Sequence, residues 1–248
     1  MDKSLPSARL FLNSLLRLSS TSITASSPPN ILISALSTMG LLQYLEYYLA
    51  RLLYNNRGRD AKLLINSALL KDIPKNIHVE SPDVGPSESQ FAIEYSQYGE
   101  SRFPQLSWSL APDAKITQAD IKEYMLLIED PDAPLPLVPN HGMYYAIPAT
   151  KTSIGPDDLK LDPERQSGGE KWLKGGFRLG KNLRGSLYSG PRPPVGHGPH
   201  RYFFQLIALK EKIDSTNLSP VATKSELVEH IKDKVIGYGV WIGVFERK

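Results

Sequence analysis

From about residue 76 to the end, the sequence alternates short apolar stretches with clusters of Pro, Gly, Asn and Asp. Because proline and glycine interrupt regular backbone structure and favour turns, this alternation predicts a sheet protein with long loops. The predicted strands are Ile77 to Glu80, Phe91 to Tyr95, Tyr124 to Glu129, Met143 to Ile147, Tyr202 to Leu209 and Tyr238 to Phe245. In the last of these, alternation places a β-branched row that includes Val240 opposite a glycine and aromatic row that includes Trp241.

Two helices are predicted outside the strands. Thr38 precedes leucines and tyrosines that recur at three- and four-residue steps from Leu41 to Leu53, which predicts an amphipathic helix ending near Asn55. Its polar face is too weakly basic for a membrane-surface helix, so we expect it to pack against the domain. Thr223 and Glu226 have the spacing of a capping box and predict a second helix after them.

A chain of 248 residues favours one core with an extension over two full-sized domains. We divide it into an N-terminal extension (1–38), a helical lead-in (39–75) and a mainly β domain (76–248). The extension is rich in Ser and Leu, and leucines from Leu10 to Leu18 could line one face of a short helix. This composition is typical of a transit peptide or of a disordered tail. We expect a cytoplasmic protein, with mitochondrial import as the alternative.

Composition excludes several classes of protein. Lys plus Arg number 29 against 26 for Asp plus Glu, without a basic run, so no extended nucleic-acid surface is expected. The absence of cysteine excludes a disulfide scaffold, a thiolate metal site and a cysteine nucleophile. Polar residues between Ser19 and Ser37 interrupt the apolar sequence before it could span a bilayer, so no transmembrane helix is expected. No cofactor is expected either.

The first group of residues that could carry chemistry stands at the end of an apolar strand, in Glu129 to Pro134. Asp130 and Asp132 are two residues apart, so in an extended segment they point to the same side. Such a pair can accept hydrogen bonds from an ammonium group or orient histidines. Taken alone, the hexapeptide is more typical of a solvated turn whose aspartates cap backbone amides.

The second group lies in Gly196 to Tyr202, before another apolar strand, and His141 precedes a third strand. Histidine near neutral pH can donate a hydrogen bond to an anion, and glycines allow backbone N–H groups to approach a ligand. This arrangement predicts a phosphate cradle. We expect His197 to be satisfied by a nearby carboxylate rather than to contact a ligand.

Three other motifs carry less weight. Gly175 to Asn182 nearly forms a P-loop, but Asn182 stands where a Ser or Thr would bind magnesium. A metal site of His197, His200, Asp130 and Asp132 is disfavoured by the rigid glycine-proline loop, and none is expected. A hydrolase triad of Ser189, His200 and Asp130 lacks a nucleophile elbow.

Together these motifs resemble the phosphatidylethanolamine-binding protein (PEBP) family over roughly residues 76 to 248. The resemblance rests on Asp130-Pro131-Asp132-Ala133-Pro134, His141, the loop from Gly180 to Pro194, and Gly198-Pro199-His200-Arg201-Tyr202. The terminal strand is similar to that of bacterial and fungal members. The helix from Met39 resembles the start of fungal ones.

The resemblance implies a large antiparallel sheet packed on a smaller sheet, with flanking helices. It also implies an anion pocket lined by Asp130, Asp132, His141 and His200, with Pro191 and Tyr202 in its wall. Arg201 is expected to be structural and to pair with an aspartate, because a guanidinium fork matches a carboxylate. Pro139 stands where animal members have a pocket tryptophan, which implies a more open pocket.

Three functions follow from this resemblance. The first is binding of a phospholipid headgroup, phosphate or carboxylate. The second is an enzyme of fungal secondary metabolism that dimerises or cyclises anionic, maleic-anhydride-type intermediates, with Asp130, Asp132, His141 and His200 as the acid-base residues. The third is inhibition of a protease or kinase partner through the N-terminal extension. The sequence leaves all three open, together with the natural ligand.

Overall fold

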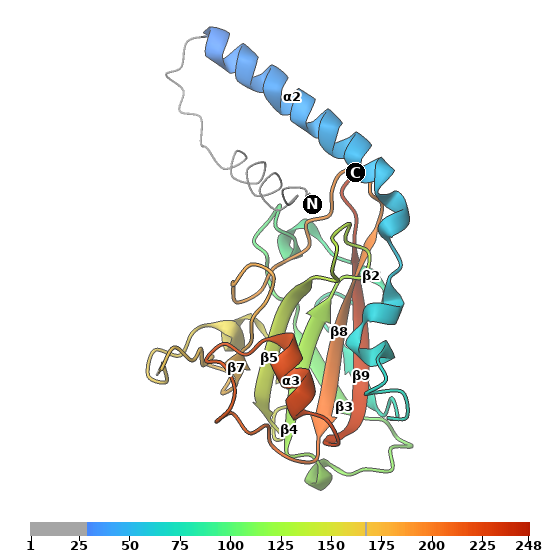
Figure 1. The fold of residues 1–248 in the computed structure, drawn as a ribbon, viewed down its shortest axis with the longest axis vertical. Coiled ribbons are helices and arrows are strands. Elements are labelled where there is room, and N and C mark those ends of the chain that lie inside the picture. The colour runs from blue at the N-terminus through green and yellow to red at the C-terminus, as the bar shows by residue number, and fades with distance from the viewer. Residues whose placement is uncertain (1–28, 167) are drawn as a thin grey trace, which may run out of the picture. The chain divides into compact units, whose positions relative to one another are not determined.

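The computed structural model of the chain describes residues 29–166 and 168–248 (Figure 1). Contacts divide the chain into two compact units, Met1–Leu45 and Glu46–Lys248. Helix α2 extends from Pro29 to Leu52. The helix expected within Leu10 to Leu18 lies outside the described residues, and the division at 38/39 and 75/76 stays a prediction.

Two sheets form the second unit, as expected from the alternating sequence. The larger has the order β2-β9-β8-β4-β5-β7 and the smaller has the order β1-β3-β6. Their strands are β1 (Ile77–Glu80), β2 (Ser89–Gln90), β3 (Leu106–Leu110), β4 (Glu123–Glu129), β5 (Asn140–Pro148), β6 (Ser153–Ile154), β7 (Arg178–Leu179), β8 (His200–Leu209) and β9 (Val235–Phe245). All pairs are antiparallel except β2 with β9. The predicted fold class, mainly β with flanking helices, is confirmed.

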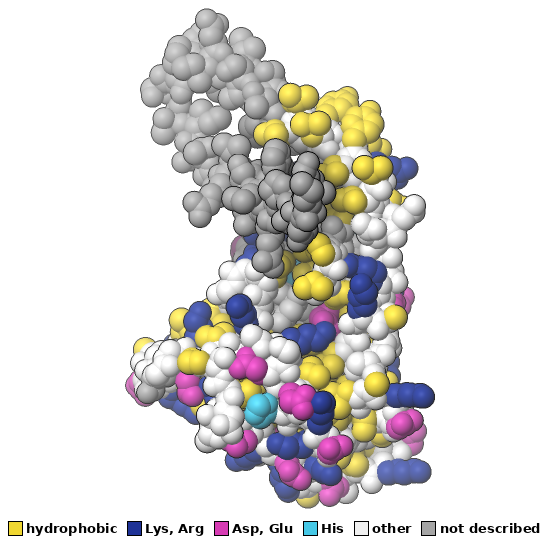
Figure 2. Space-filling view, viewed as in Figure 1, with side chains coloured by type: hydrophobic (Ala, Val, Ile, Leu, Met, Phe, Trp, Pro, Cys, Tyr) yellow, Lys and Arg dark blue, Asp and Glu magenta, His cyan; other side chains and the backbone are white. Residues whose placement is uncertain are grey.

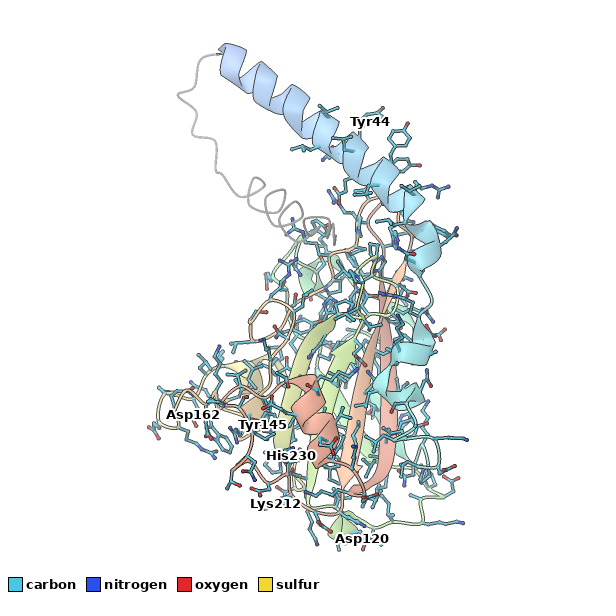
Figure 3. All side chains as sticks on the ribbon, viewed as in Figure 1. Tyr44, Asp120, Tyr145, Asp162, Lys212 and His230 are labelled. Carbon is cyan, nitrogen blue, oxygen red and sulfur yellow. The ribbon has the colours of Figure 1, made fainter. Side chains whose placement is uncertain are left out.

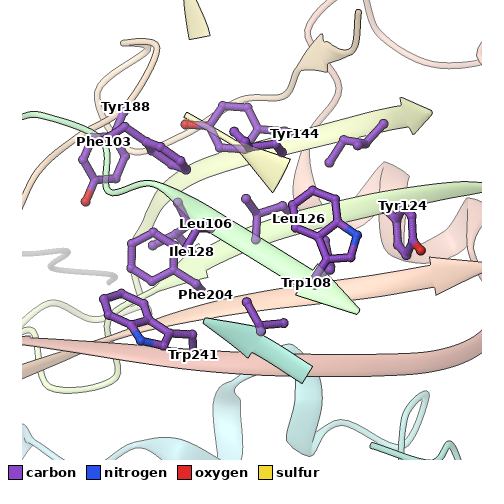
Figure 4. Close-up of a cluster of buried hydrophobic side chains, with 14 of the residues drawn as sticks. Phe103, Leu106, Trp108, Tyr124, Leu126, Ile128, Tyr144, Tyr188, Phe204 and Trp241 are labelled. Atoms are coloured by element: carbon purple, nitrogen blue, oxygen red, sulfur yellow. The ribbon is translucent and has the colours of Figure 1, made fainter. Parts of the chain in front are cut away.

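The larger sheet is buried on both faces. Between the sheets, Leu126 and Phe204 pack in one cluster with Leu106 and Trp108 of the smaller sheet (Figure 4). On the other face, a second cluster includes Met125 of β4 and residues of helix α3 (Lys224–His230). Strands covered on both sides are apolar along their whole length, which explains why β4 and β8 were predictable.

The glycine and aromatic row of β9 lies on its inner face. Gly239 and Trp241 are buried, whereas Val240 and Ile242 are only partly buried. A side chain on Gly239 would lie 2.4 Å from the carbonyl oxygen of Ile77, so β1 approaches β9 closely only because Gly239 is a glycine. The predicted alternation of this strand is confirmed.

The predicted strand Phe91 to Tyr95 is wrong. Strand β2 ends at Gln90, and Ile93–Tyr95 forms a 3₁₀ turn. The ring of Phe91 fills the space beside Gly243 and lies 5.7 Å from the ring of Trp241, so aromatic packing turns the chain inward. Local β propensity does not reveal this tertiary contact.

The start of α3 was predicted correctly, whereas the start of α2 was not. The capping box of α3 is present, because the Thr223 hydroxyl accepts from the Glu226 backbone N–H and the Glu226 carboxylate accepts from that of Thr223. Helix α2 begins at Pro29 rather than after Thr38. Proline is favoured in a first turn because its missing N–H is not needed there.

After α2 the chain continues through 3₁₀ turns at Tyr54–Asn56, Asp60–Lys62 and Leu64–Asn66. Leu64 and Leu70 are buried in the cluster that also contains Met125 of β4. The later part of the lead-in is therefore built into the same compact unit as the sheets.

Two properties of the described residues bear on partners. None of their helices is long and apolar enough to cross a membrane. Figure 2 shows basic and acidic side chains interspersed on the face that it draws, so no basic stripe of the kind that binds nucleic acid is visible there.

Candidate functional site

The turn after β4 begins where the ladder of the sheet ends. The backbone N–H of Asp130 still donates to the carbonyl of Pro139, at 3.2 Å, but Pro131 has no N–H to continue. The carboxylate of Asp130 accepts the backbone N–H of Asp132 at 2.8 Å. This local bond holds the Asp130 side chain in one orientation at the edge of the sheet.

Three predicted residues meet at this edge because β5 and β8 flank β4 on either side. Oδ2 of Asp130 lies 2.8 Å from Nδ1 of His200, the first residue of β8, and 4.0 Å from Nε2 of His141 on β5. Nδ1 of His141 donates to the carbonyl of Ser189 at 2.7 Å. The relative exposures of Asp130, His141 and His200 are 2%, 6% and 1%.

The carboxylate of Asp132 takes a different direction. It accepts hydrogen bonds of 2.9 Å from the backbone N–H groups of Arg201 and Gly58 and from the Arg201 guanidinium. Burial alone would raise the pKa of Asp132, but these bonds outweigh it and lower that pKa. Arg201 also donates to the carboxylate of Asp60 at 2.7 and 2.8 Å. Its guanidinium therefore connects the turn after β4 and the start of β8 to the lead-in.

Residues of the lead-in that the sequence did not indicate also hold this turn. The guanidinium of Arg59 donates to the carbonyls of Pro131, Ala133 and Leu135, at 3.3, 2.5 and 2.5 Å. The only signal available was the adjacent run Arg57-Gly58-Arg59-Asp60, in which charges gather directly after a helix. Its partners are more than 70 residues away in the sequence.

His197 is buried and contacts a histidine rather than a carboxylate. Its Nδ1 lies 2.8 Å from Nε2 of His200, and its Nε2 lies 3.2 Å from the carbonyl oxygen of Leu53. The ring of Tyr47 packs directly against Gly196. A Cβ atom at this position would lie only 2.4 Å from the Tyr47 ring, so a larger residue would clash with it. The segment from Tyr47 to Arg57 thus packs on the Gly196 loop.

Tyr202 and Pro191, the expected wall residues, are both buried. The ring of Tyr202 meets the ring of His141 edge-on, with centroids 5.0 Å apart. The Tyr202 hydroxyl donates to no acceptor among the described residues, and the backbone N–H of Arg192 approaches its oxygen. Burial raises the pKa of Tyr202 well above its usual range, so this hydroxyl stays protonated and can donate.

The proton positions around His141 define what the site can accept. Because Nδ1 donates to Ser189, a neutral His141 ring presents a bare Nε2 toward the Asp130 carboxylate. Burial lowers the pKa of His141, which favours this neutral form. Nε2 of a neutral His141 and Oδ2 of Asp130 are both hydrogen-bond acceptors, and they lie 4.0 Å apart without a donor between them. The site can therefore take up a proton or bind the donor group of a ligand.

The two cavities described lie elsewhere. One of about 580 Å³ runs along Ile77 and Trp241, and one of about 420 Å³ lies beside Phe103, Lys160 and Tyr188. The three converging side chains are nearly fully buried, whereas the resemblance implies a more open pocket. The packing of residues 47–57 on the Gly196 loop contributes to this burial.

The chain matches the family model described as "Phosphatidylethanolamine-binding protein" over residues 81–246. It is 44% identical over 209 residues to "Phomoidride biosynthesis cluster protein B" of Talaromyces stipitatus, covering 84% of this chain and 83% of that protein. A protein of the same name from Fungal sp. is 44% identical over 207 residues, covering 83% of this chain and 96% of that protein.

Among solved structures, the chain resembles E. coli YbcL, described as a new member of the mammalian PEBP family. The TM-score is 0.54 and the identity 24%, over 70% of this chain and 99% of that one. At this identity the likeness shows the fold alone. It agrees with the large and small sheets described above.

Proposed function

The chain belongs to the phosphatidylethanolamine-binding protein family, and on that premise we propose that it binds a small anionic ligand at Asp130, His141 and His200. One observation carries the proposal: three buried side chains from neighbouring strands converge at one end of the sheet, beside the Tyr202 hydroxyl, which donates to no group among the described residues. Converging buried polar groups that are incompletely paired are typical of binding sites.

The balance of charge favours an anion over a cation. The Asp132 carboxylate is paired with the Arg201 guanidinium, so Asp130 is the one carboxylate of the set that faces the histidines. The Tyr202 hydroxyl supplies one donor, and Nε2 of His141 supplies a second only when a proton is taken up with the anion, against the burial that keeps the free His141 ring neutral. A phospholipid headgroup, a free phosphate and a carboxylate share the oxygen chemistry that such donors recognise.

The relatives favour a metabolite over a lipid. Two fungal proteins that are 44% identical along most of their length are named as phomoidride biosynthesis cluster proteins. We therefore take the ligand to be an anionic intermediate of fungal secondary metabolism, with a carboxylate as its recognised group.

The test is calorimetry of the full chain with phosphate, phosphorylethanolamine and small dicarboxylates. We expect heat with at least one dicarboxylate, and its loss in His141→Ala. His230→Ala is the matched control, because His230 lies on α3 away from the turn (Figure 3) and bonds the Glu226 carbonyl of its own helix. Absence of heat at millimolar concentration for all three ligand types would overturn the proposal.

A second candidate is catalysis on such an intermediate, as expected from the sequence for fungal members. It is favoured by the hydrogen-bonded row of Asp130, His200 and His197 beside His141, which forms an acid-base set. The test is turnover of a maleic-anhydride-type carboxylate by the wild type and by His200→Ala. Equal product formation by the two would remove the mechanistic basis.

Inhibition of a protease or kinase through residues 1–38 stays a prediction, as do the cytoplasmic and mitochondrial locations. Deletion of residues 1–38 tests the first of these. Retained inhibition in the shortened chain would contradict an inhibitory role for the extension.

A further inference from the structure

A continuous row of hydrogen bonds passes from the lead-in to the candidate site. It begins at the carbonyl oxygen of Leu53, which lies 3.2 Å from Nε2 of His197. Nδ1 of His197 lies 2.8 Å from Nε2 of His200, and Nδ1 of His200 lies 2.8 Å from Oδ2 of Asp130. All four ring nitrogens of the two histidines are therefore engaged.

The number of protons in this row follows from its two ends. A carbonyl oxygen and a carboxylate oxygen only accept, so Nε2 of His197 and Nδ1 of His200 must each carry a proton. The contact between the rings needs a third proton. Two neutral imidazoles supply only two, so three good hydrogen bonds require one additional proton.

The additional proton belongs on a ring rather than on the carboxylate. A carboxyl group is normally more acidic than an imidazolium, and the Asp130 carboxylate also accepts the backbone N–H of Asp132. We propose that His197 and His200 together hold one proton more than two neutral rings, and that His197 is the positioning residue that keeps His200 charged.

The groups that face the pair from other segments determine where the proton sits. They are Asp130 after β4, His141 on β5, and Arg57 in the segment after α2. Burial lowers the pKa of His197, and Arg57 acts in the same direction. Oδ2 of Asp130 accepts from Nδ1 of His200 at 2.8 Å, so this contact fixes one proton at the Asp130 end of the row.

This arrangement has two consequences for the site. Asp130 with its partner histidines is electrically neutral rather than negative, so the set does not repel an anion. Loss of the additional proton leaves one proton at each end of the row, so the hydrogen bond that is lost is the one between the two rings. The link to anion binding, but not the proton count, rests on the proposed function.

The proton count is measured on the ligand-free full chain by NMR of ¹⁵N-labelled histidine rings. At pH 7 we expect three nitrogen-bound protons on His197 and His200, with at least one shifted strongly downfield. A spectrum with two, one on each neutral ring, would overturn the inference. The wild-type spectrum alone decides this point, so it does not depend on whether any variant folds.

The positioning role is tested with two substitutions. Glutamine can accept from His200 through Oε1 and donate to Leu53 through Nε2, whereas phenylalanine can do neither. His197→Gln should therefore keep the charge of His200 and the anion affinity. His197→Phe should lose both, with a dissociation constant about tenfold higher, the effect of about 1.4 kcal/mol. His230→Phe, at a histidine outside the row, should behave as the wild type.

The possible failures are distinguishable. Three ring protons without any ligand heat would overturn the proposed function and leave this inference standing. Ligand heat with only two ring protons would support the proposed function and overturn this inference. Equal affinity of His197→Phe and His197→Gln would overturn the positioning role of His197.

Discussion

At the scale of single residues, the guanidinium of Arg201 connects two aspartates from distant parts of the chain. It pairs with Asp132, whose side chain is 2% exposed, and with Asp60, whose side chain is 40% exposed. We expect Arg201→Ala to lower the free energy of unfolding by about 3 kcal/mol, because it leaves a buried carboxylate unpaired. Asp60→Asn, which removes the exposed partner, should cost less than about 1 kcal/mol. Urea denaturation measures both, and equal losses would contradict the difference assigned to burial.

The Asp132 carboxyl also predicts a dependence of stability on pH. Its pKa is lower in the folded protein than the ordinary value of 3.8, so the folded state binds this proton less readily than the unfolded state. Its contribution is therefore fully present above pH 3.8 and is lost as the pH falls through the folded-state pKa. Below pH 4, the unfolding free energy of Asp132→Asn should fall less steeply than that of the wild type. Parallel slopes would contradict this.

Motif residues were the predictable part of the site, and long-range partners were not. Asp130, His141 and His200 stand at strand ends that the apolar pattern marks, and the structure brings them together. The hydrogen bond from Gly58 to Asp132 joins residues 74 positions apart, and nothing local encodes it.

At the scale of secondary-structure elements, Glu129 at the end of β4 joins four segments. Its buried carboxylate accepts from the backbone N–H of Leu64 at 3.1 Å, from Gln205 of β8 at 2.9 Å and from Lys224 of α3 at 2.6 Å. We expect Glu129→Ala to cost about 3 to 5 kcal/mol, because three donors lose a buried acceptor.

The matched control for this prediction is an exposed ion pair between Glu229, near the end of α3, and Lys232, which follows that helix. Glu229→Ala removes the contact of Glu229 with Lys232 and should change the unfolding free energy by less than about 0.5 kcal/mol. Chemical denaturation compares the two variants. A loss below 1 kcal/mol in Glu129→Ala would show that the carboxylate does not join these elements.

Long strands were the easiest to predict, although β1, with four residues, was predicted with its observed bounds and β3, with five, was not predicted. Strands β4, β5, β8 and β9 carry long apolar or alternating patterns, and their predicted positions lie within the observed ones. Strands β6 and β7 have two residues each, too few for any periodicity to be visible. Their positions follow from pairing with distant strands instead.

At the scale of the whole molecule, the second compact unit begins at Glu46 and so includes the later part of the lead-in. We expect a chain of residues 46–248 to keep the cooperative thermal transition of the full protein. A chain of residues 76–248 should lose it, because it lacks Arg59 and the buried Leu64. Circular dichroism during heating distinguishes the two. Equal melting temperatures would contradict the structural role of the lead-in.

The pairing of Arg201 with Asp60, 141 positions apart, also constrains how the protein reaches its native state. During synthesis the lead-in leaves the ribosome before β8 has been made. Asp60 therefore has no Arg201 side chain to pair with at that stage. Contacts between residues so far apart in the sequence form slowly, because a long loop must be closed first. The native contacts of the Asp60 carboxylate can therefore form only after Arg201 has been synthesised.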